Sequence, residues 1–128
     1  MDKLRYVLDT NMIISLLRFE TVPDFFTSTE LFVSIISRME LLSKPGITPE
    51  DEREIQGFLS NVTVVGIDNT VESKVIAIRR SKKLKLPDSI IAATAVVLKA
   101  ILLTHDDQLL RFSWPLYQAQ DIAFTANV

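Results

Sequence analysis

Short apolar runs alternate along the chain with longer segments in which apolar residues recur every three or four positions. The short runs predict β-strands, because strands buried on both faces are nearly continuously apolar. We expect strands over residues 4–8, 32–36, 62–65, 101–103 and 114–118. Pro115 confines the last of these to a sheet edge. The longer segments predict helices over 12–19 with Asn11 as cap, over 37–43, 88–99 and 106–111, and onward from Thr48 and from Asp68.

This order of strands and helices sets the expected architecture. Strands that alternate with helices form a mostly parallel sheet with helices on both faces. We therefore expect an α/β fold, a three-layer sandwich whose mostly parallel central sheet is flanked by helices. The 128 residues contain no repeat, linker or low-complexity stretch, so we expect a single domain over 1–128.

Composition and charge narrow the classes of function. The chain has no cysteine, which excludes disulfides and thiolate metal sites. It has no apolar run of the roughly 18 residues that a membrane span needs and no signal-peptide pattern, so we expect a cytoplasmic protein that makes no membrane contact. The formal net charge is −2, and a protein that grips a long nucleic acid by charge alone is usually basic. Any contact with nucleic acid is therefore local or mediated by a metal.

Four acidic residues stand out by their context. Asp9 follows the first predicted strand, Glu40 lies in the helix after the second, Asp88 begins an apolar helix, and Asp106 follows the fourth strand. In open α/β sheets ligands bind beyond the carboxyl ends of the strands, where such positions converge. Clustered carboxylates repel one another unless a hard cation with oxygen ligands neutralises them, which favours Mg²⁺ or Mn²⁺ over Zn²⁺ in a chain with one histidine.

Each of these acids also has an ordinary structural reading. Asp9 belongs to an Asp-Thr-Asn sequence that is typical of turns and helix caps. Asp88, which follows Pro87, suits the first turn of a helix, and Asp106 suits a helix cap. Glu40 fits a solvated helix face. These readings stay open for each acid alone, and the joint pattern of four is what favours a metal site.

Four stretches carry a resemblance to a known family. They are Tyr6-Val7-Leu8-Asp9-Thr10-Asn11, Glu40-Leu41-Leu42, Leu86-Pro87-Asp88-Ser89-Ile90-Ile91-Ala92-Ala93-Thr94-Ala95, and Leu102-Leu103-Thr104-His105-Asp106. In this order they resemble a PIN domain, and they are especially similar to the VapC-type toxins of bacterial toxin–antitoxin pairs. The likeness covers nearly the whole chain, and the Asp88 stretch is its most specific part. Residues 20–29 and the C-terminal strand carry no recognisable family signature.

The resemblance implies a ribonuclease that depends on Mg²⁺ or Mn²⁺ and hydrolyses RNA phosphodiester bonds with a metal-activated water, leaving 5′-phosphate and 3′-hydroxyl ends. It implies Asp9, Glu40, Asp88 and Asp106 as the catalytic, metal-binding acids, with Asn11 and Thr104 as polar neighbours. Asp107 is an extra acid that could assist or replace Asp106. The resemblance also implies a cognate antitoxin that occludes the acid pocket, and a homodimer.

Several other residues have two interpretations each. A basic run before Asp88 either holds RNA phosphates or is a solvated surface; it comprises Arg79, Arg80, Lys82, Lys83 and Lys85. Arg38 approaches either the acids or a phosphate. His105 is a surface or packing residue more readily than a catalytic base. Residues 22–26, with Phe25 and Phe26, either pack in the core or anchor a partner. Trp114 is expected in the core or at a dimer contact.

Other classes of protein fit the sequence less well. A haloacid dehalogenase-type phosphohydrolase would carry a second aspartate where Asn11 stands, and a receiver domain would carry a lysine just after the strand that ends at Leu103. A PIN nuclease of RNA processing, and a PIN-like domain that only binds RNA or protein, remain as alternatives. The presence of all four acids favours an active enzyme. The sequence does not identify the RNA target.

Overall fold

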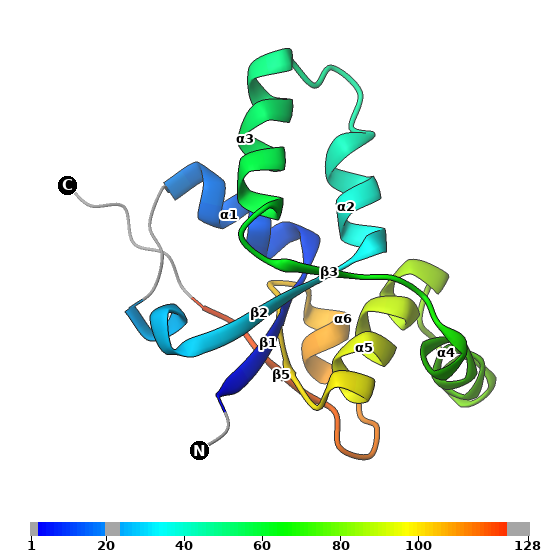
Figure 1. Cartoon of the computed structure of the whole chain (residues 1–128). Coiled ribbons are helices and arrows are strands. Elements are labelled where there is room, and N and C mark those ends of the chain that lie inside the picture. Colours follow the sequence, from blue (N-terminus) through cyan, green and yellow to red (C-terminus); the bar gives the residue numbers. More distant parts are fainter. Residues whose placement is uncertain (1–2, 20–23, 123–128) are drawn as a thin grey trace.

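The computed structural model describes residues 3–19 and 24–122, and its centre is a five-stranded sheet in which every pairing is parallel (Figure 1). The strand order is β3-β2-β1-β4-β5. The strands are β1 (Leu4–Leu8), β2 (Thr29–Ser34), β3 (Thr63–Val65), β4 (Ile101–Leu103) and β5 (Gln118–Gln120). The predicted α/β class with a parallel central sheet is confirmed.

Helices cover both faces of this sheet. They are α1 (Thr10–Phe19), the 3₁₀ helix η1 (Asp24–Ser28), α2 (Ile35–Leu42), α3 (Pro49–Leu59), α4 (Asn69–Ser81), α5 (Leu86–Leu98) and α6 (Asp107–Arg111). Alternate residues of the central strand β1 point to opposite faces. Leu8 packs with Met12 of α1 and Ile55 of α3, whereas Val7 packs with residues of α5 and α6. The core therefore lies in two layers, one on each side of the sheet.

Local sequence signals determine several helix ends. Thr48 and Asp51 form a reciprocal capping box at the start of α3, and the Asp68 side chain caps α4. Gly46 has a φ of 82°, a left-handed conformation that glycine adopts without a steric penalty, and it lies in the turn that separates α2 from α3. The predicted buried stripe of α4 is confirmed, because Val71, Val75 and Ile78 are buried.

Several predicted boundaries were wrong, including the starts of α2 at Ile35 rather than Ser37 and of α5 at Leu86 rather than Asp88. Helix α1 begins at Thr10 rather than Met12, and Asn11 is inside it rather than capping it; the backbone carbonyl of Asp9 accepts the first helical bonds. Strand β2 is 29–34 rather than 32–36, because the Ser34 hydroxyl accepts a bond from the Ile36 amide and starts α2. The last strand is 118–120 rather than 114–118.

The shift of the last strand has a local cause. The amide of Tyr117 donates to the carbonyl of Trp114, which closes a turn over Pro115 and Leu116. Leu116 has a φ of 67°, which extended strands do not allow. The strand therefore starts only at Gln118, and it does lie at the sheet edge, as expected.

The aromatic residues with open interpretations divide between core and undescribed segments. Phe26 is buried and its ring lies 6.2 Å from that of Tyr6, so it packs in the core. Residues 22 and 23, and the side chain of Phe25, lie outside what the structure describes. Trp114 stacks on Phe112 and packs against the cluster between α4 and α5, as a core role predicts. Within the described residues, no helix combines the length and apolarity that crossing a bilayer requires.

Candidate active site

The four acids singled out by the sequence lie at the carboxyl edge of the sheet. Asp9 directly follows β1, Asp106 follows β4, and Glu40 is in α2, the helix after β2. These three strands are neighbours in the sheet. Helix α5 leads into β4 and runs back across the sheet, so Asp88 in its first turn reaches the same edge. The parallel topology thus brings together acids that are up to 97 positions apart in the sequence (Asp9 and Asp106).

Asp9 is the most buried of the four, with an exposed fraction of 5%. The backbone amide of Thr10 donates to Oδ1 at 2.8 Å, and the hydroxyl of Thr104 donates to Oδ2 at 2.6 Å. Burial raises the pKa of Asp9, these two hydrogen bonds lower it, and the charges of Glu40 and Asp106 raise it again. The carboxylate is therefore held in one orientation in surroundings that disfavour its charge.

Asp88 and Asp106 are positioned by the starts of two helices. Asp88 is in the first turn of α5; burial raises its pKa, as do the charges of Asp106, Asp9 and Glu40, while Lys85 lowers it. Asp106 is the N-cap of α6, and its Oδ1 accepts bonds from the amides of Gln108 at 2.7 Å and Leu109 at 3.3 Å. The cap reading of Asp106 is thus correct, and the residue still acts electrostatically on Asp9 and Asp88. Asp107 is exposed at the first position of α6.

Glu40 is tied to the site by a threonine that the sequence reasoning missed. The hydroxyl of Thr10 donates to Glu40 Oε1 at 2.8 Å and lies 3.0 Å from the hydroxyl of buried Ser37. Thr10 therefore links Asp9, through its amide, to Glu40, through its side chain. It stands inside the Asp9-Thr10-Asn11 sequence, and its position directly after Asp9 at the end of the predicted strand was a signal that could have been used.

Polar neighbours hold the segment that follows β4. Thr104 is fully buried, and its hydroxyl also accepts a bond from the amide of Asp106 at 3.0 Å. Asn11 accepts a bond from the amide of His105 at 3.1 Å through its side-chain oxygen. The structure thus places both residues expected as supports next to the acids, where each fixes the chain that carries Asp106.

His105 points away from the acids. Its Nε2 lies 2.9 Å from the hydroxyl of Ser15, and its Nδ1 lies 2.6 Å from Oδ1 of Asp121. Both ring nitrogens are engaged between α1 and the end of the last strand, as the packing interpretation expected.

Tyr117 is a second residue that the sequence reasoning missed. Burial raises its pKa, and the charges of Asp9, Asp106 and Asp88 raise it further, so the ring lies within electrostatic reach of the site. Its hydroxyl donates to the carbonyl of Leu109 in α6 at 2.5 Å. No sequence signal marked it, because the turn that brings it inward was read as a strand.

The four acids act on one another through their charges. Their mutual charges raise the pKa of Asp9 and of Asp88. Among the described residues, no three histidine or acidic side chains form a ready-made metal cluster. The donor set still fits a hard divalent ion, because it consists of carboxylate oxygens with unused lone pairs and contains no sulfur.

The predicted basic residues lie at the end of α4 and in the connection that leads to Asp88. Arg79 and Arg80 end α4, and Lys82, Lys83 and Lys85 occupy the connection to α5; all five are exposed. Lys85 is the one of them that acts on Asp88. Arg38 is exposed two positions before Glu40 in α2, and residues at that spacing do not face one another on a helix. The structure therefore does not bring Arg38 together with the acids.

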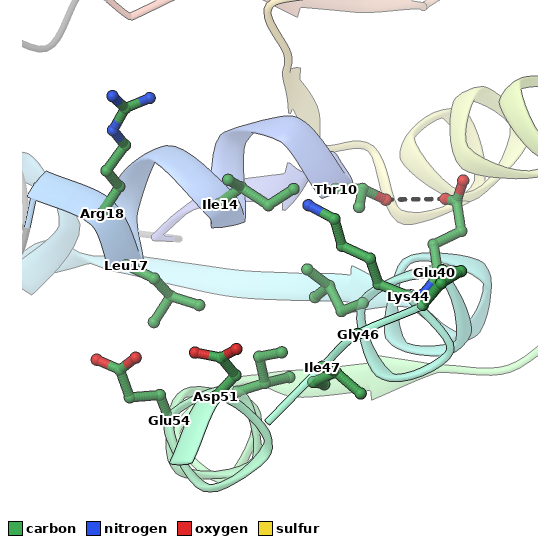
Figure 2. A pocket seen from close by; sticks show the side chains of 13 residues that line it. Thr10, Ile14, Leu17, Arg18, Glu40, Lys44, Gly46, Ile47, Asp51 and Glu54 are labelled. Carbon is green, nitrogen blue, oxygen red and sulfur yellow. Dashed lines mark hydrogen bonds between the residues drawn. The ribbon is translucent and has the colours of Figure 1, made fainter. Parts of the chain in front are cut away.

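A hollow opens beside Glu40, between α1 and the α2–α3 pair (Figure 2). Its volume is about 360 Å³. Apolar side chains of Ile14, Leu17 and Ile47 line it, and the hydrogen bond from Thr10 to Glu40 lies at one end of it, drawn as a dashed line in Figure 2. Asp51 of α3 also borders the hollow, which therefore offers apolar and charged contacts next to one of the four acids.

Comparison with known proteins assigns the family. The PIN domain model matches residues 6–115. Among curated proteins, nothing matched. The fold is similar to a chain of VapBC2 from Rickettsia felis, bound to a DNA fragment from their promoter, with a TM-score of 0.78, 17% identity and coverage of 94% of this chain and 100% of that one.

Two further structures are similar. A toxin–antitoxin complex from Klebsiella pneumoniae matches with a TM-score of 0.68, 25% identity and coverage of 88% and 94%. DNA-bound VapBC from Salmonella typhimurium matches with a TM-score of 0.72, 23% identity and coverage of 92% and 98%. With the family match over most of its length, this chain belongs to the PIN-domain family and resembles the VapC toxins within it.

Proposed function

We propose that this protein is an endoribonuclease that depends on Mg²⁺ or Mn²⁺ and acts as the toxin of a type II toxin–antitoxin pair. The observation that carries the proposal is the convergence of four carboxylates from four separate elements at one edge of the sheet. Two of them, Asp9 and Asp88, have pKa values raised by burial and by the charge of the other acids. Carboxylates held in such repulsion are expected where a cation offsets it.

Asp9, Glu40, Asp88 and Asp106 would hold the metal. A divalent ion held there would supply Lewis-acid polarisation of a phosphoryl oxygen and activation of a water molecule for in-line hydrolysis. The protein contributes orientation. Thr104 and the Thr10 amide fix the two oxygens of Asp9, and the α6 amides fix one oxygen of Asp106. Carboxylate oxygens held in fixed positions make a metal site selective for one arrangement of ion and phosphate.

The partners follow from the same proposal. Two of the similar structures described above are VapBC assemblies, and the Klebsiella one is a toxin–antitoxin complex, which supports a cognate antitoxin for this chain. The hollow beside Glu40 suits such a partner, because a segment that filled it would contact one of the four acids. Single-stranded or structured RNA is the proposed substrate, and a homodimer is the proposed assembly.

Cleavage of a mixed cellular RNA pool tests the enzyme directly. We expect the purified chain to cut RNA with Mg²⁺ or Mn²⁺, and both EDTA and the Asp88→Asn substitution to abolish cutting. Cutting that persists in EDTA would overturn the metal mechanism. Absence of any metal-dependent cutting would favour a PIN-like domain that only binds RNA or protein. Cutting without growth arrest on expression would favour an RNA-processing nuclease over a toxin.

A further inference from the structure

A second hollow lies on the opposite side of the acid edge from the one beside Glu40. It has a volume of about 340 Å³ and is formed by the α4–α5 connection and the C-terminal end of α6. We call it the basic hollow. It is defined by Lys82, Lys83, Leu84, Gln108, Arg111 and Phe112.

The lining has two kinds of surface. Lys82, Lys83 and Arg111 are exposed cations, and no acidic residue contributes to the lining. Leu84 and Phe112 are half-buried and give it an apolar wall. Aromatic and apolar walls with cations at the rim are the arrangement with which proteins hold the base and the phosphate of a single-stranded nucleotide.

Among the described residues, the cations of the hollow have no ion-pair partner. In the part that the structure describes, neither Lys82, Lys83 nor Arg111 forms a salt bridge. Five of the 14 Lys and Arg residues of this acidic chain fall between positions 79 and 85, and no acidic residue occurs between Glu72 and Asp88. A local excess of positive charge in a protein of net charge −2 is expected to bind an anion.

The basic hollow is contiguous with the acid edge. Gln108 lines the hollow, and its amide donates to Oδ1 of Asp106 at 2.7 Å. The ring of Phe112 lies edge-on to Tyr117, with ring centroids 4.8 Å apart, and the charges of Asp9, Asp88 and Asp106 act on Tyr117. A strand of RNA whose phosphate lay at the acids would therefore bring a neighbouring nucleotide to the hollow.

We propose that the basic hollow is a substrate subsite that binds a nucleotide next to the cleaved phosphodiester bond. Lys82, Lys83 and Arg111 hold its phosphate, and Leu84 and Phe112 contact its base. This subsite rests on the proposed function, because it presumes an RNA substrate. It divides the basic run of the sequence: the lysines of the hollow bind substrate, whereas Arg80, which does not line it, is a solvated surface residue.

Binding of a fluorescently labelled, mixed-sequence single-stranded RNA in EDTA tests the subsite without any cleavage. The variants are Lys83→Ala and Arg111→Ala, and the control is Arg80→Ala, an exposed cation of the same run outside the hollow. Each phosphate contact contributes about 0.7 to the salt slope on a single strand, so losing one weakens binding about fivefold at 0.1 M salt. We expect this loss for both hollow variants and not for the control.

Phe112→Leu adds a test of the base contact. It should weaken binding without changing the salt slope, because it removes no charge. Urea denaturation of Phe112→Leu shows whether this variant retains the fold. If it does not, the subsite is tested by Lys83→Ala and Arg111→Ala alone, because both substitutions are at exposed positions.

The outcomes separate the subsite from the enzyme. If the hollow variants bind RNA no more weakly than Arg80→Ala, the subsite is wrong, whether or not the protein cuts RNA. If the hollow variants lose binding as predicted while the wild type cuts no RNA with metal, the basic hollow stands as an RNA-binding site and the proposed nuclease activity fails.

Discussion

Replacing Thr104 by valine removes a hydroxyl that serves two partners at the acid edge. Thr104 is fully buried, donates to Asp9 Oδ2 at 2.6 Å and accepts from the Asp106 amide at 3.0 Å. A hydrogen bond to a charged group contributes about 1.5–3 kcal/mol and one to a neutral group about 1 kcal/mol. Valine has nearly the same shape, so no cavity adds to the effect. We therefore expect Thr104→Val to lower the free energy of unfolding by about 3 kcal/mol.

Thr94→Val is the matched control for this substitution. Thr94 is equally buried, but its hydroxyl donates at 2.7 Å to the Ile90 carbonyl of its own helix, a bond that contributes little to stability. We expect this variant to lose less than about 1 kcal/mol. In urea denaturation at pH 7.5, the midpoint concentration should fall far more for Thr104→Val than for Thr94→Val. In thermal denaturation, the Tm of Thr104→Val should fall by roughly 10 °C.

If Thr104→Val is as stable as Thr94→Val, the bond to Asp9 does not contribute as the geometry indicates. The same bond lowers the pKa of Asp9, so its loss should also make metal binding weaker at pH 6 than at pH 8, by a larger factor than in the wild type.

Three further predictions concern the charge, the metal and a distant helix. The pKa of Asp9 is raised on folding, so ionisation of Asp9 destabilises the fold as the pH rises through that pKa. Asp9→Asn should therefore have a higher free energy of unfolding than the wild type at pH 7.5, and this difference should shrink as the pH is lowered towards the unfolded pKa of 3.8. A difference that stays constant with pH would contradict the prediction. Mn²⁺ at a hundred times its Kd should stabilise the wild type by about 2.7 kcal/mol, an effect that EDTA reverses and Asp9→Asn lacks; an equal rise of Tm in that variant would place the ion elsewhere. Thr48→Ala breaks the capping box of α3 and should cost about 1 kcal/mol in denaturation while RNA binding stays unchanged, and an effect on binding would tie α3 to the substrate.

The sequence predicted the class of fold because local and global signals agree in this chain. The apolar run that forms β1 and the caps Asp68 and Asp106 each appear at the residue where the structure begins or ends an element. The all-parallel pairing follows from the alternation of strands and helices. The four acids were identified for the same reason, because each lies where a parallel sheet directs its chain to one edge.

The errors arose where long-range contacts decide the local structure. Strand β5 consists of Gln118, Ala119 and Gln120, a stretch too short and too polar for a periodic pattern to mark it, and it is held in the sheet by its pairing with β4. The basic hollow could not be predicted from the sequence either, because Arg111 and Lys83 come together only where α6 packs against the α4–α5 connection. Spacing along a chain does not report such encounters.

The most direct test of the central claim is a calorimetric titration of the protein with Mn²⁺, repeated with Asp88→Asn and with Asp107→Asn. Asp88 is one of the four acids whose charges act on one another, whereas Asp107 is exposed at the first position of α6, directly after Asp106. If the four carboxylates form one cation site, Asp88→Asn should bind Mn²⁺ at least tenfold more weakly and Asp107→Asn should bind it like the wild type. Equal binding by wild type and Asp88→Asn, or an equal loss in both variants, would contradict the account.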